Sequence, residues 1–217
     1  IFCALLSFFL SLFFTALTSR FGLKLGLIDT PNERSSHTAI IPRSGGIGIW
    51  VAFILTGLLF TQFQIFAILA GIVGLIGFLE DRFSISQKIR LVLKLIISAL
   101  VVSLLLGIPT SIISISLFVF WIIFIAGTAN FYNFMDGVDG IAGLTGVVGC
   151  GFLAFFSIYI VEKPDVALFS TVISVGCIGF LFFNFPKAKV FMGDVGSIFL
   201  GFVFAAFLIK LSTNLSI

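Results

Sequence analysis

Long apolar stretches, separated by short polar segments, follow one another along the whole sequence. Within each stretch the apolar residues are continuous, which favours helices over the alternating strands of a membrane barrel. A helix needs about 20 apolar residues to cross the hydrocarbon core of a bilayer. We therefore expect an all-α, polytopic bundle of transmembrane helices and no sheet. About eight spans are expected, near Ile1–Thr18, Gly45–Thr61, Gln64–Leu79, Ile89–Gly107, Ser111–Ala126, Gly140–Ile160, Val166–Phe183 and Gly196–Leu211.

The composition indicates which solvent surrounds the fold. Hydrophobic residues make up 60% of the 217 residues and charged residues 10%, and the mean hydropathy is +1.30. Soluble domains are about 45–50% apolar and about 25% charged. A soluble fold of this length could not cover so much apolar surface, so we expect one integral membrane domain over residues 1–217, in contact with membrane lipids. The net charge of +3 is too small to indicate nucleic-acid binding.

Basic residues gather in alternate connections between the expected spans. The opposite side has only Lys163 and Lys210. Because Lys and Arg are enriched in cytoplasmic loops, we expect the odd-numbered connections to face the cytoplasm. Seven of the nine acidic residues lie on the same side, which indicates a site that uses both signs of charge. The basic residues there are Arg20, Lys24, Arg34, Arg43, Arg82, Lys88, Arg90, Lys187 and Lys189, with Lys94 one turn further into the fourth span.

The densest polar motif runs from Asn130 to Gly140, between the fifth and sixth expected spans. Carboxylates and amides at a membrane boundary are costly unless they are paired, hydrated or bound to a cation. Asn133, Asp136 and Asp139 recur every three residues, so a helical turn would bring them near one face. The alternative is an interfacial loop with capping aspartates.

A second motif, Phe191-Met-Gly193-Asp194-Val-Gly196-Ser197, opens the last expected span. Asp194 at a helix start fits two interpretations: an N-cap, or a ligand of Mg²⁺, which is usually held by one or two carboxylates with water and phosphate.

A third motif, Glu80-Asp81-Arg82, follows the third expected span. Adjacent carboxylates repel each other and can raise one pKa, which suits a base or a metal ligand. The alternative is a solvated pair at the membrane boundary.

The longest polar segment runs from Asp29 to Gly46 and ends in Pro42-Arg43-Ser-Gly-Gly. Its prolines and glycines indicate a shaped loop, and Arg43 could bind an anion. His37 is the only histidine in the chain, so it cannot form a zinc site with several histidines; it remains a candidate for substrate binding.

Together, these four motifs, in this order and on one face, resemble the polyprenyl-phosphate N-acetylhexosamine-1-phosphate transferases of glycosyltransferase family 4. The resemblance runs from about Asp29 to Ser197, and the loop Asn32-Glu-Arg-Ser-Ser-His37 is most similar to members that make O-antigen and capsule. It implies a multi-pass enzyme of the bacterial inner membrane whose active site faces the cytoplasm. The enzyme would move a sugar-1-phosphate from a UDP-sugar to polyprenyl phosphate and release UMP. A homodimer is a further expectation.

The resemblance also implies roles for single residues. Asp194 matches the ligand of Mg²⁺, for which Mn²⁺ is an alternative. Asn133 and Asp136 match the ribose and diphosphate region. The uracil pocket corresponds to Gly137, Val138, Asp139 and Phe191, and Gly193 is counted with the substrate-binding residues.

Two features depart from the family. Glu80 stands where the family usually has the first of two adjacent aspartates, which are proposed to bind or deprotonate the lipid phosphate; the resemblance gives this role to Glu80 and Asp81. We count Asp136 and Asp139 with them as candidate catalytic residues. The family also has further helices and a later loop rich in His and Arg, so we expect this chain to be truncated at both ends.

Two other classes of membrane protein are alternatives. A membrane transporter or channel would favour ionisable residues at mid-bilayer, whereas the acids here lie at the span ends. An intramembrane aspartyl protease would carry Gly-x-Gly-Asp, but Phe191 stands where that motif has its first glycine.

Overall fold

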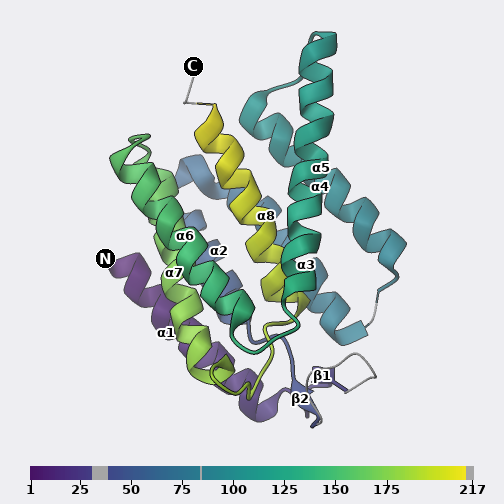
Figure 1. Ribbon diagram of the computed structural model, residues 1–217, viewed down its shortest axis with the longest axis vertical. Helices are drawn as coiled ribbons and strands as arrows, with labels where there is room; N and C mark the ends of the chain where they lie inside the picture. The colour runs from purple at the N-terminus through teal and green to yellow at the C-terminus, as the bar shows by residue number, and fades with distance from the viewer. Residues whose placement is uncertain (31–38, 84, 214–217) are drawn as a thin grey trace.

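The computed structural model describes residues 1–30, 39–83 and 85–213 (Figure 1), and the loop positions Arg34 and His37 fall outside them. Helices account for most of the described chain, with one short 3-10 helix, η1 (Thr61–Phe63), after the second of them. The helices are α1 (Phe2–Phe21), α2 (Ile47–Leu59), α3 (Gln64–Phe83), α4 (Gln87–Leu106), α5 (Ile112–Met135), α6 (Ile141–Tyr159), α7 (Pro164–Asn184) and α8 (Gly193–Ser212).

The expected polytopic, all-α architecture is confirmed, because each apolar segment forms a helix. Seven of the helices in the described residues are long and apolar enough to cross a membrane, whereas α2 has only 13 residues. It begins after Gly46, because the backbone N–H groups of Gly45 and Gly46 donate to the carbonyl oxygens of Phe191 and Met192, at 2.8 and 2.9 Å.

The expectation of no sheet is wrong in one place outside the apolar segments. Strands β1 (Ile28–Asp29) and β2 (Ile41–Pro42) pair in antiparallel register, with Ile28 opposite Pro42. The backbone of a polar loop has no helical partners, so it satisfies its N–H and C=O groups by pairing across the loop.

Helices α3 and α5 both continue past their expected ends. Glu80 and Asp81 therefore lie on the last turns of α3, and Asn130 and Asn133 lie on α5. A polar residue can mark the boundary of the apolar layer without ending the helix. Helix α5, for example, ends only at Met135, before Asp136-Gly137.

The ends of the helices divide into two groups. The connections α1–α2, α3–α4, α5–α6 and α7–α8 all lie at the lower end of the bundle in Figure 1, which is the separation that the basic residues predict. Helix α8 is buried along most of its length and packs against α3 and α5, so its first residues lie among the polar ends of its neighbours.

Candidate active site at the start of the last helix

Polar side chains from four helices meet at the first turn of α8. The carboxylate of Asp194 accepts a hydrogen bond from Asn133 Nδ2 at Oδ1 and another from Arg90 Nη1 at Oδ2, each at 2.8 Å. Arg90 Nη1 also lies 3.4 Å from Glu80 Oε1, and Asn133 Nδ2 lies 3.0 Å from Ser197 Oγ. Side chains of α3, α4 and α5 thus gather around Asp194 of α8.

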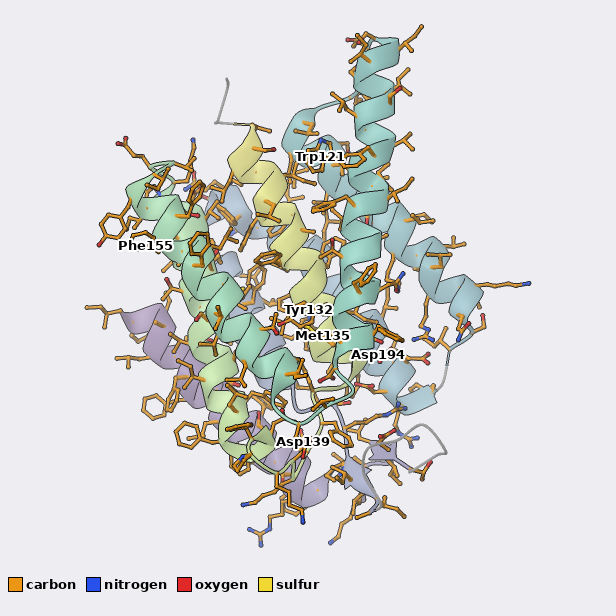
Figure 2. All side chains as sticks on the ribbon, viewed as in Figure 1. Trp121, Tyr132, Met135, Asp139, Phe155 and Asp194 are labelled. Atoms are coloured by element: carbon orange, nitrogen blue, oxygen red, sulfur yellow. The ribbon has the colours of Figure 1, made fainter. Side chains whose placement is uncertain are left out.

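Asp194 does not cap its own helix. The N-cap residue of α8 is Met192, and it makes no side-chain cap. The side chain of Asp194 points to α4 and α5, as its two partners show, and Figure 2 places it at the lower end of α8. The capping interpretation of Asp194 is therefore wrong, and its role as a metal ligand stays a prediction.

Carboxylates at the ends of two other helices, α3 and α5, cap α8 in its place. Asp81 Oδ1 accepts from the backbone N–H of Asp194 at 3.0 Å, and Asp81 Oδ2 from that of Val195 at 3.4 Å. Asp136 accepts from the backbone of Gly193. Asp81 is almost completely buried, so the structure places it against the backbone of α8 and away from solvent.

Asp136 lies directly after α5 and shares its surroundings with two other acids. Burial raises the pKa of the Asp136 carboxyl well above its usual value, and the negative charges of Asp194 and Asp81 raise this pKa further. The hydrogen bond from Gly193 acts in the opposite direction. A group of carboxylates such as this one favours the binding of a cation. Within the described residues, however, no three Asp, Glu, His or Cys side chains form a metal site by themselves.

A polar cavity of about 290 Å³ adjoins Asp194 between α4, α5 and α8. Lys94 in its wall donates a hydrogen bond to Asn130 Oδ1. Two cations and three amides line it, and no acid does, so its electrostatic character suits an anion. The lining residues are Gln87, Arg90, Leu91, Lys94, Asn130, Asn133 and Ile198.

Arg90 and Lys94 were missed as site residues, although the sequence carries a signal for them. They are four residues apart on α4, so both face the same side of the helix. Lys94 is also buried within an apolar run, where an ionisable residue by default indicates function.

Asp139 lies apart from Asn133, contrary to the expectation of one shared face. Because α5 ends at Met135, Asp139 belongs to the α5–α6 connection, where its Oδ2 accepts from the Ala188 backbone N–H at 3.0 Å. Beside it, Asn184 accepts from Gly140 N–H at 2.8 Å and donates to Val190 O at 2.9 Å. These bonds join the α5–α6 and α7–α8 connections, which carry the residues expected around uracil.

The other expected pocket residues lie around the same two connections. Gly137 and Val138 are exposed, and the main chain of Phe191 is held by Pro42 O and Gly45 N–H, both at 2.8 Å. No described contact tests whether these residues bind a nucleotide, so this role stays a prediction.

Arg43 holds the end of α3. Its guanidinium Nε donates to the Asp81 carbonyl oxygen at 3.0 Å and lies 3.6 Å from Asp81 Oδ1. Basic side chains commonly satisfy the last carbonyls of a helix in this way. The contacts give Arg43 a structural role, and its expected binding of an anion stays a prediction.

Comparison with known proteins agrees with these motifs. Residues 63–212 match the family model of glycosyl transferase family 4. The chain is 31% identical over 210 residues to the "probable undecaprenyl-phosphate N-acetylglucosaminyl 1-phosphate transferase" of Bacillus subtilis, covering 88% of this chain and 57% of that protein. It is 33% identical over 199 residues to the "undecaprenyl-phosphate alpha-N-acetylglucosaminyl 1-phosphate transferase" of Thermotoga maritima, covering 91% and 60%. The chain thus spans somewhat more than half the length of these relatives, and it belongs to glycosyl transferase family 4.

Proposed function

We propose that this protein transfers a sugar-1-phosphate of the N-acetylhexosamine type from a UDP-sugar to a polyprenyl phosphate such as undecaprenyl phosphate. The names of its relatives support the reaction class. The observation that carries the proposal is the pairing of Asp194 with Asn133 and Arg90 beside a cation-lined cavity. In the reaction, an oxygen of the lipid phosphate attacks the phosphorus that bears the sugar, the bond from this phosphorus to the bridging oxygen breaks, and UMP leaves with that oxygen.

Magnesium fits the donor set at this site. Asp194 would hold the ion. Asp136 is the second candidate ligand because its carboxyl lies near Asp194 and Asp81: burial first, and then the charges of these two acids, raise its pKa. Mg²⁺ usually takes one or two carboxylates and completes its shell with water and phosphate oxygens, and Mn²⁺ would accept the same ligands. When bound, the ion supplies charge neutralisation for the diphosphate, which is the main requirement of phosphoryl transfer.

Arg90 and Lys94 would bind phosphate oxygens in the cavity. Arg90 Nε and Glu80 Oε2 are both buried and have no hydrogen-bond partner within the described chain. Buried polar atoms are normally paired. The unpaired Arg90 N–H therefore supports an anionic oxygen next to it, and the unpaired Glu80 oxygen supports a hydrogen-bond donor or a cation. Glu80 would then lie beside the lipid phosphate, as the position of the third motif implies.

The polar end of the bundle would face the cytoplasm of a bacterial inner membrane. The basic residues of the four lower connections support this orientation. The lipid substrate would arrive from the bilayer and the UDP-sugar from the aqueous side, and the product would start the synthesis of a surface polysaccharide. The transporter and protease alternatives are not favoured, because the relatives are named as transferases.

The test is UMP release by the purified protein in liposomes that contain undecaprenyl phosphate, with a panel of UDP-sugars. We expect release that requires both the lipid phosphate and Mg²⁺ and that stops on addition of EDTA. Liposomes without undecaprenyl phosphate are the control. Uptake of a solute into sealed vesicles without UMP release from any UDP-sugar would contradict the proposal.

A further inference from the structure

We propose that Asp81, supported by Ser44, is a positioning residue: it caps α8 from the end of α3 and thereby sets the place of Asp194. The two acids of the third motif would then have different roles: Glu80 faces Arg90, and Asp81 binds the backbone of α8. This role deepens the proposed function, and it rests on that function only in assuming that the reaction requires Asp194.

The carboxylate of Asp81 is fully engaged by donors. Oδ1 accepts from Asp194 N–H at 3.0 Å, and Oδ2 accepts from the Ser44 hydroxyl at 2.6 Å and from Val195 N–H at 3.4 Å. Both Asp81 and Ser44 are buried, with exposed fractions of 1% and 0%. A group enclosed in this way has neither an open oxygen nor a path to a lipid phosphate, so it is poorly placed to take a proton from one.

The start of α8 needs such a cap from outside. The first four N–H groups of a helix have no partner within the helix, and Met192 at the N-cap makes no side-chain cap. A carboxylate at this end also interacts favourably with the helix dipole. Asp81 satisfies the second and third N–H groups, of Asp194 and Val195.

Close packing fixes the junction in position. Gly193 has φ +74°, and a Cβ atom there would lie 2.4 Å from Asp81 Oδ2 and 2.6 Å from the Ser44 nitrogen. One turn earlier in α3, a Cβ atom on Gly77 would lie 2.4 Å from the carbonyl oxygen of Asp194. The end of α3 therefore meets α8 without room for a side chain, and the hydrogen bonds of Asp81 set the register of this contact.

Asp81 is thus connected to the reaction through Asp194. Its bond to the Asp194 backbone fixes the point from which the Asp194 side chain reaches Asn133 and Arg90. If the cap is lost, the first turn of α8 can fray and the carboxylate of Asp194 loses its fixed position. A proton acceptor and a positioning residue therefore give different mutational patterns at position 81.

The decisive experiment is hydrogen–deuterium exchange of the purified protein in detergent, read over residues 191–198. In Asp81→Ala, which has no acceptor, we expect exchange to be about 2- to 30-fold faster, as for the loss of a helix cap. Asp81→Asn keeps one acceptor oxygen and should lie between Ala and the wild type. Asp165→Asn is the matched control, because Asp165 pairs with Lys210 at 3.1 Å near the other end of α8, and should leave exchange over residues 191–198 unchanged.

Two further measurements separate positioning from folding alone. Mn²⁺ binding, followed by electron paramagnetic resonance, should weaken in Asp81→Ala and weaken less in Asp81→Asn. In UMP release, Asp81→Asn should keep measurable turnover with the wild-type pH profile and an unchanged KM for the UDP-sugar. If Asp81→Ala does not fold, Ser44→Ala serves in its place, and faster exchange over residues 191–198 is again expected.

Two results would overturn the inference. The first is wild-type exchange at the start of α8 in both Asp81→Ala and Ser44→Ala. The second is complete loss of UMP release in Asp81→Asn with wild-type exchange and Mn²⁺ affinity, which is the pattern of a proton acceptor. If the wild type itself releases no UMP, the proposed function fails, whereas the exchange data still decide whether Asp81 caps α8.

Discussion

Asn133 and Asp194, 61 residues apart in the sequence, are joined by a hydrogen bond of 2.8 Å from the amide of one to the carboxylate of the other. The two residues come from the two densest motifs of the chain, which meet because α5 and α8 pack side by side. An amide donor of this kind leaves the negative charge of Asp194 in place, and this charge is what a metal ion requires.

The first prediction concerns Asp194→Asn. Because Asp194 does not cap α8, and because an amide oxygen can still accept from Asn133 or Arg90, this change should leave the thermal stability nearly unchanged. It should abolish UMP release, since a neutral amide binds a hard dication weakly. Thermal unfolding and UMP release of the same preparation test both parts, and near-normal turnover at ordinary Mg²⁺ would remove Asp194 from the metal site.

The second prediction concerns Asp136→Asn and the dependence of stability on pH. The pKa of Asp136 is raised in the folded state, so the folded protein binds this proton more tightly than the unfolded chain does. Stability should therefore fall as the pH rises from the unfolded pKa through the folded pKa. In EDTA at neutral pH, Asp136→Asn should raise the melting temperature and flatten its pH dependence. It should also reduce the stabilisation that Mg²⁺ gives, and an unchanged response to Mg²⁺ would exclude Asp136 as a ligand.

The third prediction concerns Phe191→Ala. If the ring stacks on uracil, the affinity for the UDP-sugar should fall by about 1–3 kcal/mol, while the dependence on Mg²⁺ remains. The backbone bonds of Phe191 to Pro42 and Gly45 do not involve its ring, so the fold should be kept. Phe134→Ala, which removes an exposed ring on α5, is the control. Equal KM values for the two variants and the wild type would place Phe191 outside the pocket.

The fourth prediction concerns orientation in the membrane. Lys187 lies in the α7–α8 connection and Pro164 at the start of α7, at opposite ends of the bundle. Cysteine at position 187 should react with an impermeant thiol reagent only from the cytoplasmic side, and cysteine at position 164 only from the other side, each in a variant without native cysteines. Labelling of both positions from one side would contradict the helix order.

The apolar pattern was sufficient to predict every α-helix of the described residues, but neither η1 nor the positions where the helices end. Hydropathy reports the thickness of the apolar layer, and α3 and α5 continue beyond it as far as Phe83 and Met135. The spacing of Asn133 and Asp139 therefore suggested a shared face that the helix end at Met135 removes. The paired strands at Ile28 and Ile41 were missed because each has only two residues.

The motifs located the candidate site, while the partner of each side chain required the structure. Asp81, Asp139 and Asp194 are the same residue type at the same membrane boundary. Asp81 and Asp139 accept bonds from backbone N–H groups, and Asp194 instead meets Asn133 and Arg90 beside the cavity. Sequence spacing cannot separate these cases, because the choice depends on contacts between helices distant along the chain.

The carboxylates at the start of α8 affect where this protein can bind an anion. The amino end of a helix is ordinarily a ready place for phosphate, but here the N–H groups of Gly193, Asp194 and Val195 already donate to Asp136 and Asp81. Under the proposed function, phosphate would then be held by Arg90 and Lys94, which stand on another helix, α4. Affinity for the anion would thus depend on α4 and affinity for the metal on α8, and the hydrogen bond from Arg90 to Asp194 would couple the two.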